Sequence, residues 1–368
     1  EELSKFARKH NIPVTPTVMG IGCMDKDDPY YIGAIGCLGE GSSNNLSKET
    51  DMAIAIGTKL GDFTTGSWTN FQNPEFQLIS INTARFDVTK HRATPVISDA
   101  KIGLLELSKL LGDWKAEENW YVKALEEKKE WDTYVEKQSG PTNQETPSYA
   151  HAVGAVYRNA DKSDIVVTAA GGLVGEVVQI WKPKQINTFE TEWGYSCMGY
   201  EISGALGIKM AKPDQDVIVF IGDGSYLLQN SDIYSSIIYD KKLIIIVCDN
   251  GGHMVINRLQ LAKGGKEYLC NLNSARATNV TFVDFEAHAK SMGANGETVK
   301  STSELEAAFK RAKKSDKTYV ISIKTHGYEW LEGTAFWESP TLEVASTEEN
   351  KKAYDEFLIG KKKQRKGV

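Results

Sequence analysis

The hydrophobic pattern of the first 115 residues alternates between helical and strand-like segments. Apolar residues recur at helical spacing in 1–10 and again in 101–111. Between them, 51–57 and 77–82 are short apolar runs typical of buried strands, and 12–17 is a proline-bounded run that we expect to be extended. The alternation predicts a parallel α/β unit. Because this unit opens on a helix with no strand before it, we expect the chain to begin inside a domain.

A second unit follows a helical linker. Residues 116–147 contain a charged helix with a sparse apolar stripe and then a stretch rich in helix breakers, 139–147. From 148 to 345, continuous apolar runs alternate with helical segments, which is typical of a parallel sheet covered on both faces. The predicted strands are 165–168, 186–189, 216–221, 243–248 and 318–324, and the predicted helices are 198–211, 284–292 and 303–314.

The predicted fold class is therefore α/β with two parallel-sheet units, the first over 1–115 and the second over 148–345. Residues 346–368 form a charged C-terminal tail that includes the basic run KKKQRK at 361–366. Such a run is typical of a solvated chain end.

Composition narrows the classes of partner. The chain has 368 residues, 41% of them hydrophobic and 25% charged, so it can bury real cores. The net charge of -6 argues against nucleic acid as the main partner. The longest apolar runs are about six residues long where a bilayer needs roughly 20, so we expect no membrane span. The 5 cysteines contain no C-x-x-C pair, which fits a reducing cytoplasm.

Three glycine-bearing clusters follow predicted strands directly. They are AAGGL at 169–173, GDGS at 222–225 and DNGG at 249–252. Each cluster alone is typical of an ordinary turn. The carboxyl ends of parallel strands meet at one edge of the sheet, where ligands bind in open α/β folds. Together, the clusters therefore favour a cofactor site over three unrelated turns.

Two side chains in these clusters suit a metal ion. Asp223 supplies an anionic oxygen and Asn250 a neutral one, and Mg²⁺ bridging phosphates needs few protein oxygens. The glycines allow the backbone to approach a diphosphate closely. The residues therefore predict a magnesium-bound diphosphate cofactor.

The pattern of Gly222-Asp223-Gly224 followed by Asn250 resembles the signature of the thiamine-diphosphate-dependent enzymes. The resemblance implies that Asp223, Asn250 and the carbonyl of Gly252 hold Mg²⁺, with Asp249-Asn250 in place of the family's usual Asn-Asn pair. The cofactor-binding residues that it implies are Gly171, Gly172, Leu173, Ser196, Met198, Gly222, Gly224 and Ser225. Met198 would support the bent cofactor, and a carbonyl near Ser196 would accept from its amino group.

The segment 192–207 and several segments of the first unit, including 71–74 and 85–87, look like one branch of this superfamily, the trihydroxycyclohexanedione hydrolases of inositol breakdown. The resemblance implies hydrolytic C–C cleavage that opens a cyclic 1,2-diketone to an acid, 5-deoxyglucuronate. It also implies a cytoplasmic oligomeric enzyme of carbohydrate metabolism. A related thiamine enzyme of the acetolactate-synthase or 2-oxoacid-decarboxylase type would carry the same metal loop and stays an alternative.

In this family a pyrimidine-binding domain, which lies before the central domain, carries a glutamate that activates the cofactor. We expect this glutamate to lie outside the present chain, so that the chain is either a fragment or pairs with a chain that supplies it. A non-catalytic chain that requires such a partner is a further alternative. Within the chain, His253 follows the metal loop and is a candidate proton relay, although a surface histidine is equally compatible.

Overall fold

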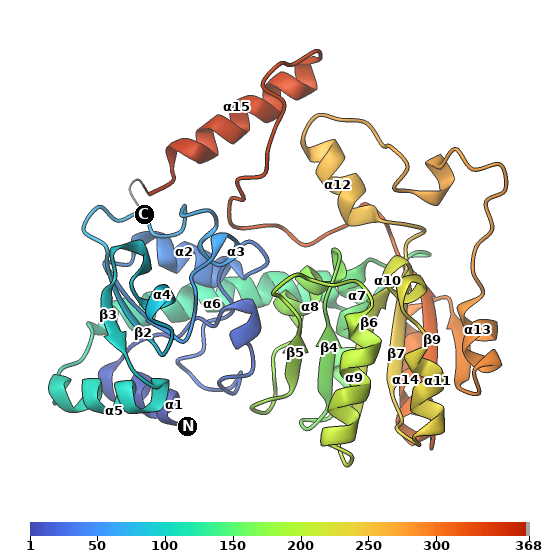
Figure 1. Ribbon diagram of the computed structural model, residues 1–368, viewed down its shortest axis with the longest axis horizontal. Coiled ribbons are helices and arrows are strands. Elements are labelled where there is room, and N and C mark those ends of the chain that lie inside the picture. The colour runs from blue at the N-terminus through green and yellow to red at the C-terminus, as the bar shows by residue number, and fades with distance from the viewer. Residues whose placement is uncertain (366–368) are drawn as a thin grey trace. The chain divides into compact units, whose positions relative to one another are not determined.

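The computed structural model describes residues 1–365, which divide into two compact units (Figure 1). Unit 1 comprises Glu1–Tyr134, Gly333–Thr341 and the residues from Asp355 onward, and unit 2 comprises Val135–Glu332 and Leu342–Tyr354. Two of the four borders fall inside helices, α6 (Glu118–Ser139) and α15 (Glu348–Lys362), and the other two fall in the segment between β9 and α15. Helix α15 occupies most of the predicted tail, and position 366 of the basic run lies outside the described residues. The family-domain borders 1–115, 116–147 and 148–345 stay predictions.

Unit 1 is built on a three-stranded parallel sheet in the order β1-β2-β3. The expected strands are confirmed as β1 (Met52–Ile56) and β2 (Gln77–Asn82). The third strand, β3 (Thr94–Ile97), was not expected because it is short and contains Pro95, which is tolerated only at a sheet edge. The expected extended run 12–17 forms no strand; only Val14 makes an isolated bridge, to Tyr31.

Helices and aromatic side chains complete unit 1. A cluster that includes Ile35, Leu60, Phe71, Phe76 and Leu78 is buried against the sheet. The helical elements are α1 (Glu2–His10), η1 (Val18–Gly20), α2 (Gly41–Glu49), α3 (Asp62–Thr65), α4 (Arg85–Val88), η2 (Lys90–Arg92), α5 (Ala100–Leu111) and the first part of α6.

Unit 2 is built on a six-stranded sheet in the order β5-β4-β6-β7-β9-β8, and every neighbouring pair is parallel. Its strands are β4 (Ile165–Thr168), β5 (Phe189–Thr191), β6 (Val217–Gly222), β7 (Ile244–Asp249), β8 (Asn295–Val299) and β9 (Tyr319–Lys324). The central strands are buried over nearly their whole length, which confirms the expectation of a sheet covered on both faces. The α/β class with two parallel-sheet units is therefore confirmed.

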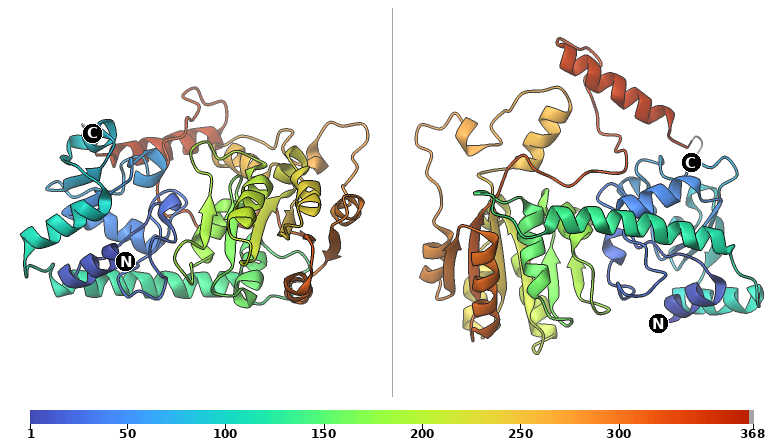
Figure 2. Two further views of the ribbon diagram at one scale, coloured as in Figure 1. Left: turned by 60° about the horizontal axis from the view of Figure 1, so that its bottom comes forward. Right: turned by 180° about the vertical axis from the view of Figure 1, so that it is seen from behind.

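Helices pack on both faces of this sheet. Figure 1 shows α9 and α11 in front of it, and the view from behind in Figure 2 shows α14 in front of it. On the first face, alternate residues of β6 and β7, such as Val219 and Ile245, pack against Ile202 and Ile233. The helical elements are α7 (Tyr149–Asn159), α8 (Leu173–Ile180), α9 (Tyr200–Ala211), α10 (Asp223–Leu228), α11 (Asp232–Ile238), α12 (Met254–Ala262), η3 (Leu272–Ser274), α13 (Phe285–Ser291) and α14 (Thr302–Lys314).

Two expected boundaries in unit 2 moved for local backbone reasons. The strand predicted over 186–189 begins only at Phe189, because Asn187 adopts a left-handed conformation with φ 61° that interrupts extended backbone. The helix predicted from Met198 begins at Tyr200, because Gly199 adopts φ 95° and ends the preceding turn.

The strand order of this sheet reverses beside β4. From β4 the chain moves outward to β5 and then crosses back to β6 on the other side, so the strand order reverses between β4 and β6. Loops diverge at such a reversal and leave room for a ligand at the carboxyl ends of the strands. The clusters 169–173 and 222–225 leave the sheet on the two sides of this point.

Candidate metal and diphosphate site

The structure brings the predicted metal-binding residues of β6 and β7 to one edge of the sheet. Gly222 is in register with Cys248, so Asp223 and Asp249 are the next residues on two neighbouring strands. The Asp223 carboxylate accepts hydrogen bonds from the backbone N–H groups of Gly252 and Gly224. The clusters 222–225 and 249–252 are therefore in direct contact, as the spacing of the sequence predicted.

Asp223 is a buried carboxylate that lacks a cation. Its side chain belongs to a residue only 6% exposed, and no salt bridge joins it to a Lys, Arg or His among residues 1–365. Burial, and then the nearby Asp249 carboxylate, raise the pKa of Asp223 to about 6. Asp249 differs, because Lys324 forms an ion pair with it. Asp223 is thus the carboxylate at this edge that a metal ion would neutralise.

Asn250 presents an amide oxygen with no partner. Its Nδ2 donates to the Tyr149 hydroxyl at 2.7 Å, whereas its Oδ1 is buried and accepts no hydrogen bond. An unsatisfied buried oxygen is costly unless a ligand completes it. A Cβ added at Gly222, the residue before Asp223, would lie 3.8 Å from the Tyr149 hydroxyl oxygen, so both clusters approach this one hydroxyl. The donor set of one carboxylate and one amide oxygen fits a hard cation such as Mg²⁺.

Gly252 provides the third implied ligand, its carbonyl, from a backbone that only glycine adopts easily. Its φ is 145°, and an added Cβ would come within 2.3 Å of the Cys270 carbonyl oxygen. Gly252 also forms an antiparallel bridge with Asn271. Among the described residues, no group of three or more His, Cys, Asp or Glu side chains could hold a metal, so the candidate site rests on one carboxylate, one amide and one carbonyl.

The diphosphate corner after β4 is held from two sides. Gly171 has φ 79°, and Gly172 lies so close to Trp330 that an added Cβ would come within 2.2 Å of its ring. The Leu173 side chain is in the core, so only its backbone is available to a cofactor. Ser196 donates its hydroxyl hydrogen to the Ala169 carbonyl at 2.8 Å. The predicted segment around Ser196 is therefore attached to this corner.

Glu201 is a buried residue of the candidate site to which the sequence analysis assigned no role. One carboxylate oxygen accepts from the Ala170 N–H at 3.2 Å and the other from the Gly199 N–H at 2.8 Å. The Ser225 hydroxyl donates to the same buried carboxylate. Glu201 thus joins the 169–173 cluster, the turn before α9 and the 222–225 cluster. The sequence signal that could have identified it is an acidic residue in the first turn of a helix whose N-cap is a glycine, Gly199.

Met198 and His253 both lie beside Gly224. A Cβ added at Gly224 would come within 2.8 Å of the His253 ring and 3.4 Å of the Met198 methyl group. Met198 is 37% exposed, which is high for a core methionine and leaves its side chain available to a ligand. His253 is exposed as well. Both candidates therefore border the same glycine, and their roles toward cofactor or substrate stay predictions.

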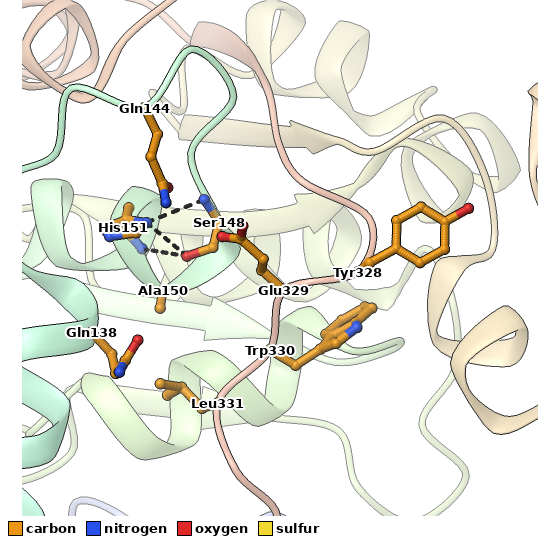
Figure 3. A pocket seen from close by; sticks show the side chains of 9 residues that line it. All are labelled: Gln138, Gln144, Ser148, Ala150, His151, Tyr328, Glu329, Trp330 and Leu331. Carbon is orange, nitrogen blue, oxygen red and sulfur yellow. Dashed lines mark hydrogen bonds between the residues drawn. The ribbon is translucent and has the colours of Figure 1, made fainter. Parts of the chain in front are cut away.

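A pocket of about 460 Å³ lies beside this site in unit 2 (Figure 3). One wall is the start of α7, where Ser148 and His151 cap the helix reciprocally and the Ser148 Oγ lies 2.8 Å from His151 Nδ1. Another wall is formed by residues 328–331, which follow β9. Trp330 belongs to both places, because it lines the pocket and also covers Gly172. The Trp330 side chain therefore joins the pocket to the diphosphate corner.

Glu176, on α8, holds the segment 328–331 through a hydrogen bond to its backbone. Its Oε1 accepts from the Leu331 N–H at 2.9 Å, while its Oε2 is buried without a partner. Desolvation raises the pKa of Glu176 to about 7. The carboxyl group is therefore near its titration point at neutral pH.

We expect Glu176→Gln to flatten the pH dependence of stability. A carboxyl whose pKa is raised in the folded state stabilises the fold below pH 4.5 and loses that contribution as the pH rises past 7. The amide keeps an acceptor for Leu331 and carries no charge, so the variant should exceed the parent by about 2 kcal/mol at pH 8 and by little at pH 5. Urea unfolding at both pH values checks this. Glu145→Gln, at an exposed position, is the control; equal pH profiles for parent and Glu176→Gln would contradict the expectation.

Membrane insertion finds no support among the helices. In residues 1–365, no helix combines the length and the apolar character that crossing a bilayer requires.

Comparison with known proteins gives two family matches. Residues 1–107 match the family described as "Thiamine pyrophosphate enzyme, central domain". Residues 169–323 match "Thiamine pyrophosphate enzyme, C-terminal TPP binding domain". The second match contains all three glycine-bearing clusters together with Ser196, Met198, Glu201 and His253, whereas Tyr149, Lys324 and the segment 328–331 lie outside it.

Curated relatives match nearly the whole chain. A protein of Bacillus anthracis named 3D-(3,5/4)-trihydroxycyclohexane-1,2-dione hydrolase is 33% identical over 96% of this chain and 60% of its own length. A Bacillus cereus protein named as hydrolase 2 of the same kind is 32% identical over 99% of this chain and 62% of its own length. A Lacticaseibacillus casei hydrolase of the same name is 32% identical over 97% of this chain and 59% of its own length. The chain thus spans about three fifths of the length of these relatives.

Proposed function

Because the chain belongs to the thiamine pyrophosphate enzymes and contains their central and cofactor-binding domains, we propose that it takes part in the hydrolytic opening of a cyclic 1,2-diketone. The proposed substrate is 3D-(3,5/4)-trihydroxycyclohexane-1,2-dione and the product is 5-deoxyglucuronate, in inositol catabolism in the cytoplasm. The observation that carries this proposal is the similarity to hydrolases of that name over 96% of the chain. It argues against the acetolactate-synthase and decarboxylase alternatives.

We propose that the cofactor is thiamine diphosphate bound with Mg²⁺. Asp223, Asn250 and the Gly252 carbonyl would hold the metal, and the unpartnered Oδ1 of Asn250 and the cation-free carboxylate of Asp223 support this donor set. The backbone of Gly171, Gly172 and Leu173, together with Gly222, Gly224 and Ser225, would surround the diphosphate. When bound, the cofactor supplies a nucleophilic carbon that adds to a ketone and accepts the electron pair of the broken C–C bond.

The chain's own residues would orient the reaction. Ser196 and Met198 would position the organic part of the cofactor, since both lie on the segment that Glu201 and Ala169 hold at the diphosphate corner. His253, beside Gly224, would relay protons to or from the substrate. A subunit that carries the pyrimidine-binding domain, in a homo-oligomer of a longer protein or as a separate partner chain, would supply the activating glutamate.

Two measurements test the proposal. Isothermal titration of the chain with thiamine diphosphate in the presence of Mg²⁺ tests the site, and omission of Mg²⁺ should weaken binding at least tenfold. Turnover of the trihydroxycyclohexanedione, compared with pyruvate, by the native protein that contains this chain tests the substrate. Turnover of pyruvate alone would overturn the proposed substrate and leave the cofactor assignment intact.

A further inference from the structure

An amide side chain must be held in one of two orientations to serve as a metal ligand. Rotation of the Asn250 amide by 180° would exchange Nδ2 and Oδ1 and would point hydrogen atoms at a cation. In the structure Nδ2 donates to the Tyr149 hydroxyl at 2.7 Å, and Oδ1 has no partner. The orientation of the amide therefore depends on what the Tyr149 oxygen does.

The contact between the two side chains makes the Tyr149 oxygen the acceptor. The Nδ2 of Asn250 carries two hydrogen atoms and no free lone pair, so in the 2.7 Å contact it donates to a lone pair of the Tyr149 oxygen. This hydrogen bond directs Oδ1 away from Tyr149 and leaves it without a partner.

Tyr149 is itself held firmly. It is the first residue of α7, directly after the Ser148 cap, and is only 4% exposed. Its ring packs edge to face against Trp330, with centroids 5.6 Å apart, and Trp330 covers Gly172. A side chain with these contacts has little freedom to move away from Asn250.

We propose that Tyr149 is a positioning residue that presents the Oδ1 of Asn250 to the metal ion. This inference rests on the proposed metal site, and it adds to that site a residue from a helix that precedes all three glycine-bearing clusters in the chain. Tyr149 touches neither metal nor cofactor; it acts through the amide and, by way of Trp330, joins the metal corner to the diphosphate corner.

A double-mutant cycle tests the inference. We expect Tyr149→Phe to lower the affinity for Mg²⁺, titrated calorimetrically at saturating thiamine diphosphate, by roughly 10–100-fold. Asn250→Asp replaces the amide with a carboxylate, whose two oxygens are equivalent, so it needs no orienting partner. In the Asn250→Asp background, Tyr149→Phe should therefore change the Mg²⁺ affinity by less than about threefold.

The controls separate orientation from general damage. Tyr157→Phe removes a phenol hydroxyl from the other end of α7 and should leave Mg²⁺ affinity unchanged. An equal loss in both backgrounds would show that Tyr149 only supports the fold, and no loss in either would show that it does not orient the amide. Both results overturn the inference. If the parent chain binds no Mg²⁺ with the cofactor, the metal site and the inference fall together, whereas a parent that binds Mg²⁺ and ignores Tyr149→Phe removes the inference alone.

A second readout does not require metal. In the metal-free chain, Tyr149→Phe should shift the side-chain amide resonances of Asn250 and speed their hydrogen exchange, because the Nδ2 group loses its acceptor. Unchanged resonances would contradict the hydrogen bond on which the inference depends.

Discussion

Asp223→Asn is expected to abolish Mg²⁺-dependent binding of thiamine diphosphate and, at the same time, to stabilise the metal-free chain. The carboxylate is buried, faces Asp249 and has a pKa raised to about 6. Because its folded-state pKa is raised, it weakens the fold as the pH rises through 6. Its removal should add about 2 kcal/mol to the unfolding free energy at pH 7.5. The amide keeps one oxygen that can accept from the Gly252 or Gly224 N–H, so the loop should largely keep its shape.

The two effects have opposite signs, which makes the prediction sharp. Affinity for the cofactor with Mg²⁺ should fall by more than about 100-fold by calorimetry, while thermal unfolding without metal shifts upward. Asp214→Asn, at an exposed position in the turn between α9 and β6, is the control and should change neither quantity appreciably. A variant that loses stability and cofactor affinity together would indicate that Asp223 is a structural residue and not a metal ligand.

Gly252→Ala is expected to have the second large effect on cofactor affinity, because the added Cβ would collide with backbone atoms. At φ 145° an alanine is strained, which costs of order 1–3 kcal/mol. The new Cβ would also meet the Cys270 carbonyl oxygen at 2.3 Å, and a main-chain atom cannot rotate away. The loop must shift, which moves the Gly252 N–H off Asp223 and displaces the carbonyl that we propose as a ligand. We expect cofactor affinity to fall by at least about 100-fold and stability to fall measurably.

A matched glycine tests whether the effect is specific. Gly207 lies inside α9, where an added Cβ would meet nothing within 4 Å. Gly207→Ala should keep cofactor affinity and leave stability equal or slightly higher, because alanine favours a helix. Calorimetry and chemical unfolding of both variants give the comparison. Near-parental cofactor affinity in Gly252→Ala would show that this backbone is not part of the site.

The sequence predicted the central strands of each sheet better than the edge strands, of which only β1 was predicted. Buried strands such as β6 and β7 are continuous apolar runs, so their positions were predicted to within a residue or two. The strands that were missed or displaced, β3, β5 and β8, all lie at sheet edges. There proline, glycine and polar residues are tolerated, so no apolar run marks the strand.

The site shows the same division. Asp223 and Asn250 were nominated as metal ligands because each follows a buried strand and stands next to glycine. The order of parallel strands determines which of the loops at their ends meet, so local spacing was enough to predict that these two loops are neighbours. Tyr149 and Trp330 come from distant parts of the chain and carry no motif, and their contacts follow only from tertiary packing. Glu201 was within a recognised segment, but its hydrogen bonds to Ala170 and Gly199 depend on how α9 lies against β4.

The shared carboxylate of Glu201 has an energetic consequence for this protein. One buried group accepts from Ala170, Gly199 and Ser225, so the loop after β4, the turn before α9 and the start of α10 cannot loosen separately. Losses of affinity from substitutions in these three loops should therefore not sum: after the first has broken the common bond, a second has little left to remove. Ligand affinity at this site therefore depends on the three connected loops together, and the contribution of one residue depends on whether the other two loops are intact.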